Sequence, residues 1–273
     1  MQKFFIDSGE LTKISEIIDK LQQDLDFYGD TWGMKKRFAG ITTNPKALAA
    51  HFTESFSLND LHAYLTDLNS LLSRKRLDGI IYIQIPNDDK NPDNLRIMCD
   101  FVRSLDFKVG IKIPHYTYFL EESEKYADIS FNVTGVSDYN IAAKALSHSS
   151  IDYVSIIPGR MEAADISYES GLSILRDNLC SLNNSKVIAG SMRTLSQLKT
   201  VLQYNCVPTI GATAFDNIFK DLSSNEDSGF FQLFDRNWCV LRDDYDEENS
   251  KGTELSKSFF DEMNKVNLLN IYG

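Results

Sequence analysis

Long apolar runs and a basic, apolar leader are both missing from this sequence. No stretch of about 18 consecutive apolar residues occurs among its 273 residues, which argues against a membrane-spanning helix. Residues 1–30 have no basic start followed by an apolar run, so we expect no secretory signal peptide. We therefore expect a protein of the cytoplasm that has no membrane partner.

Cysteine and positive charge are also scarce. The four cysteines lie tens of residues apart and form no C-x-x-C pair: Cys99, Cys180, Cys206 and Cys239. This spacing fits small buried side chains in a reducing compartment better than a zinc site or a disulfide framework. The formal net charge of -11 argues against a general nucleic-acid binder, because neutralising many phosphates requires a basic face. A local basic pocket for one small phosphate is still compatible with such a chain.

Short apolar runs alternate with amphipathic helical patterns along most of the chain. The runs that we interpret as strands span residues 3–7, 37–43, 79–85, 109–113, 128–134, 152–157, 186–190 and 207–211. Helical patterns lie near 11–21, 58–72, 92–105, 117–126, 138–147, 167–182 and 195–204. Repeated strand-helix units with nearly all-apolar strands imply a parallel sheet that is covered on both faces.

Eight such units in a chain of this length predict a closed (β/α)8 barrel, or TIM barrel. An open doubly wound sheet is the alternative, since periodicity does not give the strand order. No Gly-rich dinucleotide-binding loop follows the first strand, which weighs against that alternative.

The C-terminal part of the sequence differs from the repeated units. An acidic segment, 242–252, is followed by apolar positions at helical spacing. We expect residues 1–220 to form the barrel and residues 221–273 to form a C-terminal helical extension. This extension would pack either on the barrel or on a neighbouring subunit, so a homo-oligomer is one of the two expected arrangements.

Polar side chains stand near the carboxyl ends of seven of the eight expected strands, where the active site of a parallel barrel lies. They are Asp7, Thr42, Asn44, Gln84, Lys112, Asn132, Thr134, Ser155, Ser191 and Arg193. Each would be costly in a dry core without a hydrogen-bond partner. Their recurrence on seven strands favours a shared polar pocket over independent structural hydrogen bonds.

Lys112 lies between two isoleucines in "VGIKI". Burial would lower the pKa of its amine, and a neutral amine can attack a ketone to form a Schiff base. The alternative is a structural ion pair with Asp7 or another acid, which would raise the pKa. His115 follows three residues later, and for this histidine packing or solvent contact is favoured over a role in catalysis.

The segments "FFIDSGE", "GITTNP", "IQI", "IKIP", "NVT" and "GSMR" stand in this order at the expected strand ends. Together they resemble the transaldolase family, especially its shorter branch that includes fructose-6-phosphate aldolases, over about residues 3–215. The resemblance implies an enzyme without a metal or organic cofactor, in which a lysine on the fourth strand forms a Schiff base with a ketose phosphate. Lys112 occupies that position.

The resemblance also implies roles for the other polar residues. Asp7 would assist proton transfer at the hydroxyl next to the bond that breaks, while Thr134 and Gln84 would orient a catalytic water. The dihydroxyacetone portion and the pocket wall would involve Thr42, Asn44, Asn132 and Ser155. The substrate phosphate would be held by Arg160, Ser191 and Arg193. For the two arginines, surface salt bridges are the alternative.

Two positions depart from the family patterns. Typical transaldolases have glutamate where this chain has Gln84, and glutamine is the pattern of the fructose-6-phosphate aldolase branch. That branch has tyrosine, and transaldolases usually have phenylalanine, where this chain has Ile157. Without a carboxylate at 84 or a phenol at 157, we expect slow hydrolysis of the Schiff base and a modest preference for transfer.

The expected function is therefore a transaldolase of pentose phosphate metabolism. It would transfer a dihydroxyacetone unit from sedoheptulose 7-phosphate to glyceraldehyde 3-phosphate, giving erythrose 4-phosphate and fructose 6-phosphate. Two alternatives remain open: an aldolase that releases dihydroxyacetone, and a sugar-phosphate-binding barrel that has lost its chemistry.

Overall fold

The computed structural model describes residues 2–28, 33–85, 91, 93–167, 186–224, 229–235, 250–266 and 268–271. The barrel strands are β1 (Phe4–Asp7), β2 (Phe38–Thr42), β4 (Ile80–Gln84), β5 (Val109–Ile113), β6 (Ser130–Val136), β7 (Ile151–Ile156), β8 (Val187–Ala189) and β9 (Val207–Gly211). The helices are α1 (Leu11–Tyr28), α2 (Gly33–Arg37), α3 (Pro45–Ala49), α4 (Leu58–Arg74), α5 (Asp93–Arg103), α6 (Thr117–Ser123), α7 (Tyr139–Leu146), α8 (Pro158–Ala163), α10 (Leu195–Gln203), α11 (Ala212–Ser224), α12 (Phe230–Asp235) and α13 (Ser250–Lys265).

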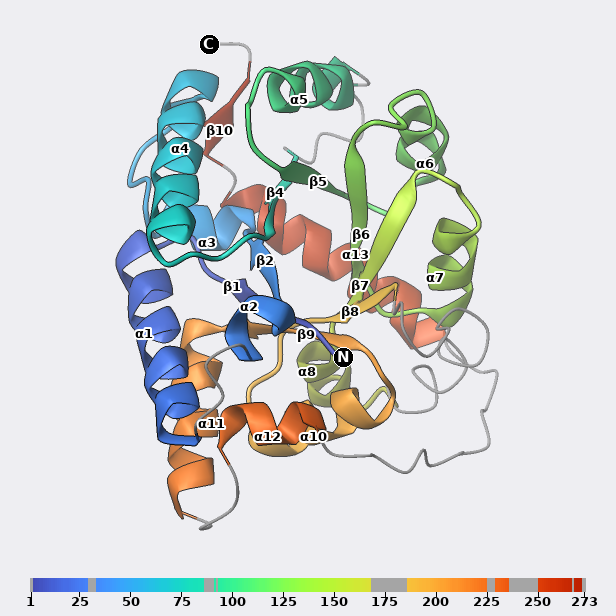
Figure 1. Ribbon diagram of the computed structural model, residues 1–273. Coiled ribbons are helices and arrows are strands. Elements are labelled where there is room, and N and C mark those ends of the chain that lie inside the picture. The colour runs from blue at the N-terminus through green and yellow to red at the C-terminus, as the bar shows by residue number, and fades with distance from the viewer. Residues whose placement is uncertain are drawn as a thin grey trace.

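The eight barrel strands pair in parallel and close in the order β1-β2-β4-β5-β6-β7-β8-β9. Helices surround them as an outer ring (Figure 1). The (β/α)8 barrel predicted from the sequence is therefore confirmed, and the open doubly wound sheet is excluded, because β9 pairs with β1. The helix predicted near 167–182 falls outside the described residues from position 168 onward.

Several short elements of the fold are not predicted by the sequence pattern. Strands β3 (Phe56–Ser57) and β10 (Leu269–Asn270) form a small separate parallel sheet. Runs of two residues are too short to leave a hydrophobic period. The short helix α8 was also missed, although Pro158 stands at its first turn, where proline is favoured because its fixed backbone angle suits the helix.

Aromatic side chains fill the barrel interior near the amino ends of the strands. The ring centroids of Phe5, Tyr82 and Tyr153 lie 5.9–6.1 Å apart in each pairing. Gly110 on β5 makes room for this cluster, because a Cβ there would lie 2.4 Å from the Tyr82 ring. The aromatic cluster closes this end of the barrel, so any open site must lie toward the carboxyl ends of the strands.

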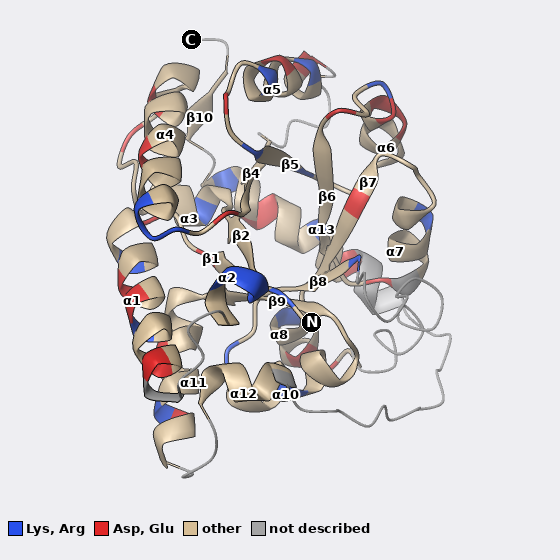
Figure 2. Ribbon diagram, viewed as in Figure 1, with Lys and Arg blue, Asp and Glu red and all other residues tan. Residues whose placement is uncertain are grey.

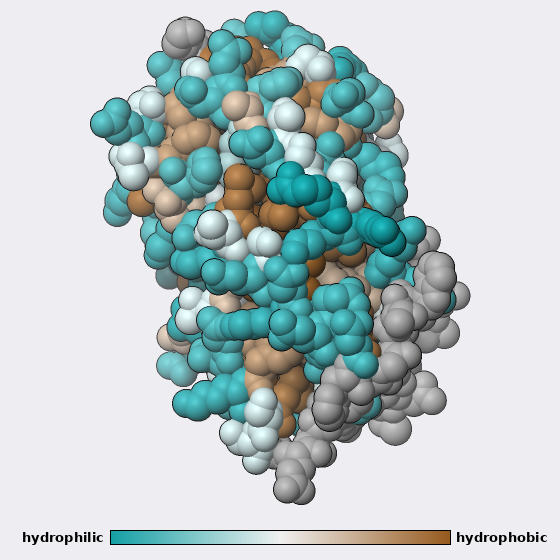
Figure 3. All heavy atoms as spheres, turned by 60° about the vertical axis from the view of Figure 1, so that its left-hand side comes forward, coloured by the Kyte–Doolittle hydropathy of each residue, from teal (hydrophilic) through white to brown (hydrophobic). Residues whose placement is uncertain are grey.

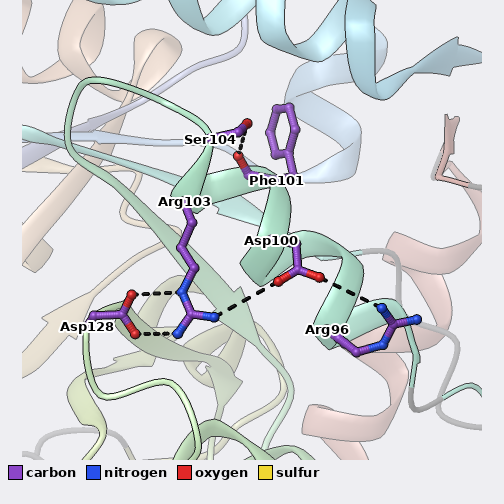
Figure 4. A network of polar contacts seen from close by, with 6 residues as sticks. All are labelled: Arg96, Asp100, Phe101, Arg103, Ser104 and Asp128. Carbon is purple, nitrogen blue, oxygen red and sulfur yellow. Dashed lines mark hydrogen bonds and ion pairs between the residues drawn. The ribbon is translucent and has the colours of Figure 1, made fainter.

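The charged residues lie mainly on the helices and loops of the outer ring (Figure 2). On the face in Figure 3, hydrophilic side chains predominate and apolar atoms show between them. Figure 4 shows one charged network on the outside of α5, in which Nε and Nη2 of Arg103 donate to the two carboxylate oxygens of Asp128 at 2.8 and 2.6 Å. Both side chains are exposed, so this pair contributes little to stability. Among the described residues, no helix is long and apolar enough to cross a membrane.

Helix α13 contacts β6, α3 and α8, so it packs on the barrel of its own chain (Figure 1). Helix α11 runs through positions 220 and 221, where the sequence suggested a change from barrel to extension. The division into two domains stays a prediction. Of the four cysteines, Cys99 and Cys206 are buried thiols, and the other two lie outside the described residues.

Replacing Gly40 by alanine is expected to lower the free energy of unfolding by about 2–4 kcal/mol. Gly40 has φ of 148°, and a Cβ there would lie 1.9 Å from the Ile80 carbonyl oxygen on the neighbouring strand. Urea unfolding followed by circular dichroism measures the change. Gly211→Ala is the matched control, because its Cβ would meet only the Asp7 carbonyl oxygen, at 3.8 Å. Equal stability of the two variants would contradict the close approach of β2 and β4.

Candidate active site

A polar layer lies above the aromatic cluster, toward the carboxyl ends of the strands. Side chains alternate between the two faces of a strand, so the residue two positions after an inward aromatic also points inward. By this rule and by their contacts, the polar layer consists of Asp7, Thr42, Gln84, Lys112, Asn132, Ser155 and Thr209. The register confirms part of it, since Gln84, Lys112 and Asn132 are direct partners across β4, β5 and β6.

Lys112 is the buried cation of this layer. Its side chain is almost wholly enclosed, with the residue 6% exposed, and Nζ donates a hydrogen bond of 2.8 Å to the Thr43 carbonyl oxygen. Burial lowers the pKa of the amine, and the nearby Asp7 carboxylate opposes this shift without overcoming it. The alternative reading of Lys112 as a simple structural ion pair predicted a raised pKa. The direction found here instead favours a neutral amine that can act as a nucleophile.

Asp7 belongs to a chain of side-chain hydrogen bonds across three neighbouring strands. Thr42 Oγ1 donates to Asp7 Oδ1 at 3.0 Å and lies 2.8 Å from Thr209 Oγ1. Since Oγ1 of Thr42 donates its only proton to Asp7, Thr209 is the donor in the second bond. This chain fixes the orientation of the carboxylate on the side of the barrel that faces Lys112.

Thr209 was missed by the sequence analysis. It is the one polar side chain in the strand "VPTIG", and it is buried. The sequence contains a signal for this residue. Side chains alternate along a strand, so a single threonine two residues from the strand end points to the same face as the strand's other inward residue.

Gln84 and Asn132 flank Lys112 on the neighbouring strands and keep amide atoms unused. Ser155 Oγ donates to Asn132 Oδ1 at 2.8 Å. The Asn132 Nδ2 group and both amide atoms of Gln84 are buried and have no hydrogen-bond partner among the described residues. Unpaired buried amides are costly in a native protein and usually mark a site that a ligand or water completes. These atoms are therefore placed to bond a group that binds beside Lys112.

Thr134 and Asn44 lie at the edge of the polar layer. Thr134 is buried on β6, two residues beyond Asn132. Asn44 follows β2, and its Oδ1 accepts a hydrogen bond of 2.9 Å from the Ala47 backbone N–H, which caps helix α3. The cap leaves its amide nitrogen for another partner. Ile157 is buried in the hydrophobic core at the start of α8.

The three residues expected to hold a phosphate differ in their surroundings. Arg160 Nη1 donates to Glu262 Oε2 of α13 at 2.7 Å, and its guanidinium carbon lies 5.0 Å from the Phe259 ring centroid. Ser191 has a left-handed backbone, with φ of 55°. Its carbonyl oxygen lies so close to Gly159 that a Cβ at position 159 would clash with it. Arg193 is exposed. The structure thus brings Arg160 and Ser191 to one corner and directs Arg193 toward the surface.

His115 lies just beyond β5 and packs under α13. Its ring centroid lies 5.6 Å from that of Phe260, and its Nδ1 is buried without a hydrogen-bond partner among the described residues. Burial lowers the pKa of His115, with the Asp138 carboxylate opposing the shift. Its position agrees with the packing role that was favoured. Within the described part of the chain, no group of three or more His, Cys, Asp or Glu side chains could hold a metal ion.

Comparison with known proteins supports the fold. No protein-family model and no curated protein matches this sequence. Among solved structures, two crystal forms of N-acetylneuraminate lyase from Mycoplasma synoviae are similar, each with a TM-score of 0.50 and 12% sequence identity. The first covers 96% of this chain and 97% of the lyase chain, and the second 97% and 98%. At this identity the likeness concerns the barrel fold alone.

Proposed function

We propose that this protein is a Schiff-base enzyme of the aldol type that acts on ketose phosphates. The observation that carries the proposal is Lys112, an enclosed lysine with a lowered pKa in a ring of polar side chains at the catalytic end of the barrel. The resemblance of the strand-end motifs to transaldolases supports the same class of chemistry, and the barrel fold is one that an N-acetylneuraminate lyase shares.

In the proposed reaction the neutral amine of Lys112 attacks the C2 carbonyl of the ketose. The resulting carbinolamine loses water and becomes a protonated Schiff base, which serves as an electron sink. Asp7 then takes the proton of the C4 hydroxyl, the C3–C4 bond breaks, and its electron pair forms an enamine while the aldehyde leaves. The Thr42 and Thr209 hydroxyls hold Asp7 in position for this proton transfer.

The fate of the enamine decides between transfer and hydrolysis. In transfer, the enamine adds to the aldehyde carbon of an acceptor, the proton returns to the new hydroxyl, and water releases the product ketose from Lys112. In hydrolysis, the enamine carbon is protonated to give a Schiff base again, and water then releases dihydroxyacetone from Lys112. The Gln84 amide can hold a water but cannot take its proton, so we propose transfer as the main reaction.

The finer assignment is a transaldolase that uses sedoheptulose 7-phosphate as donor and glyceraldehyde 3-phosphate as acceptor. An aldolase that releases dihydroxyacetone from fructose 6-phosphate is the second candidate, because glutamine at position 84 is the pattern of that branch. In both cases the bound group beside Lys112 would use the free amide atoms of Asn132 and Gln84.

Reduction of the Schiff base tests the proposal. Incubation with fructose 6-phosphate and cyanoborohydride is expected to add one covalent group, which peptide mass spectrometry locates on Lys112. Lys108 provides the control, since it lies on the same segment but its side chain is 70% exposed. In the Lys108→Met variant, Lys112 should still be labelled fully. Labelling of surface lysines without Lys112 would refute Schiff-base chemistry at this site.

The same preparation separates the candidate functions. Transfer to erythrose 4-phosphate is expected to be faster than the release of free dihydroxyacetone from fructose 6-phosphate alone. Release at a rate that equals transfer would favour the aldolase. N-acetylneuraminate belongs in the panel as a ketose acid without phosphate, and adduct formation with that substrate alone would exclude both sugar-phosphate reactions.

A further inference from the structure

Helix α13 covers the carboxyl ends of three consecutive barrel strands. Phe259 fits against Gly135 of β6, where a Cβ would lie 2.3 Å from its ring. Ser256 Oγ accepts a hydrogen bond of 3.0 Å from the Ser137 backbone N–H just after β6, and Phe260 packs on His115 just after β5. With Arg160 following β7, these contacts place α13 across the mouth of the barrel, and Figure 1 shows the helix crossing the strands at this level.

Glu262 of α13 joins two cations that come from opposite sides of this mouth. Its carboxylate contacts Arg160 Nη1 at 2.7 Å and Lys46 Nζ at 3.4 Å. Arg160 lies on α8 after β7, and Lys46 lies on α3 after β2. In the closed strand order β2 and β7 stand opposite each other. The two cations therefore approach one carboxylate from opposite sides of the barrel opening.

We propose that Lys46 and Arg160 together bind the phosphate of the sugar substrate, and that Glu262 occupies this anion site until the phosphate displaces it. The proposal rests on the ketose-phosphate chemistry proposed for Lys112. It adds Lys46 to the phosphate site and makes Glu262 an internal competitor that opposes the binding of phosphorylated substrates.

The exposure of the side chains and the charge of the phosphate favour displacement of the Glu262 carboxylate by a substrate phosphate. The side chains of Lys46 and Glu262 are 67% and 42% exposed, and exposed ion pairs of this kind are weak. A phosphate monoester carries more charge than a carboxylate and offers three acceptor oxygens, which suit the guanidinium fork. The Arg160 hydrogen bond holds the pKa of Glu262 below its usual range, so the carboxylate is ionised at neutral pH. Rotation of the Glu262 side chain is sufficient, since Phe259, Phe260 and Ser256 keep α13 attached.

Glu262→Gln tests the competition. We expect the KM for fructose 6-phosphate to fall by about threefold to tenfold, because the neutral amide competes less well for Arg160 and Lys46. The KM for unphosphorylated fructose should stay unchanged. Inorganic phosphate, measured as an inhibitor of fructose 6-phosphate turnover, should become more potent by a similar factor. Lys46→Met should have the opposite effects, raising the KM for fructose 6-phosphate without changing that for fructose.

Asp216→Asn is the matched control. Asp216 is an exposed carboxylate of α11 that pairs with Lys20 at 2.6 Å on the side of the barrel, so the variant changes the net charge by the same amount. It should leave both KM values unchanged. A higher KM for fructose 6-phosphate in Glu262→Gln would mean that Glu262 positions Arg160. An equal change in the KM for fructose and for fructose 6-phosphate would mean a general effect of the substitution. Either result refutes the proposal. If fructose 6-phosphate and cyanoborohydride do not label Lys112 in the wild-type protein, the proposed function is refuted instead.

Discussion

Lys112→Met is expected to abolish adduct formation and to lower turnover of fructose 6-phosphate by at least about 10³-fold. No other lysine belongs to the described polar layer, so this substitution removes the only amine in it that can form a Schiff base. Cyanoborohydride labelling and steady-state assays measure the two effects. Residual turnover within tenfold of the wild type would mean that the reaction does not pass through a Schiff base on Lys112.

The same variant should stay folded, and its stability reports on the pKa of Lys112. Burial lowers this pKa below the ordinary value of 10.5, so the unfolded state binds more protons than the folded state between these two values. The wild type therefore gains stability as the pH rises through that window, whereas methionine does not titrate. The Thr43 carbonyl loses its donor in the variant, which offsets part of any gain.

The expected result is a difference in unfolding free energy that changes with pH. The advantage of Lys112→Met over the wild type should be largest below the lowered pKa and should shrink as the pH approaches 10.5. Urea unfolding at about pH 6 and about pH 10 measures it. A difference that is the same at both pH values would mean that Lys112 titrates normally in the folded protein.

Asp7→Asn should separate cleavage from Schiff-base formation. Asparagine can still accept the Thr42 hydrogen bond but cannot take the proton of the substrate hydroxyl. We expect kcat for cleavage of fructose 6-phosphate to fall by about 10²–10⁴-fold. Labelling by dihydroxyacetone and cyanoborohydride should persist, and it should be faster at neutral pH, because the carboxylate that raises the Lys112 pKa has been removed.

Asp152→Asn is the control for this experiment. Asp152 is an exposed carboxylate near the amino end of β7, at the end of the barrel opposite the polar layer. The variant should retain both cleavage and labelling. If Asp7→Asn loses labelling as completely as cleavage, Asp7 acts in forming the Schiff base and its role in breaking the carbon-carbon bond must be abandoned.

Local sequence patterns were enough to predict the eight barrel strands and most of the polar layer. All eight predicted runs overlap an observed strand, and the segment around Lys112 matches β5 at both ends. This was possible because strand patterns are local: a few consecutive residues carry the apolar run, and the polar residue at its end belongs to the same run. Thr209 could have been found in the same way, but a lone threonine is a weaker signal than a lysine or an aspartate.

How these strands come together and what surrounds the site depend on contacts between distant parts of the chain. The closure of β9 on β1, the Lys112 bond to Thr43 and the Thr42 bond to Thr209 join segments far apart in the chain. The bridge from Arg160 to Glu262 spans 102 positions and sets α13 over the barrel mouth. No local pattern encodes such contacts, because an apolar helical face indicates burial without naming its partner. The sequence supplied a lysine at a strand end, and the folded barrel supplied the enclosure that lowers its pKa.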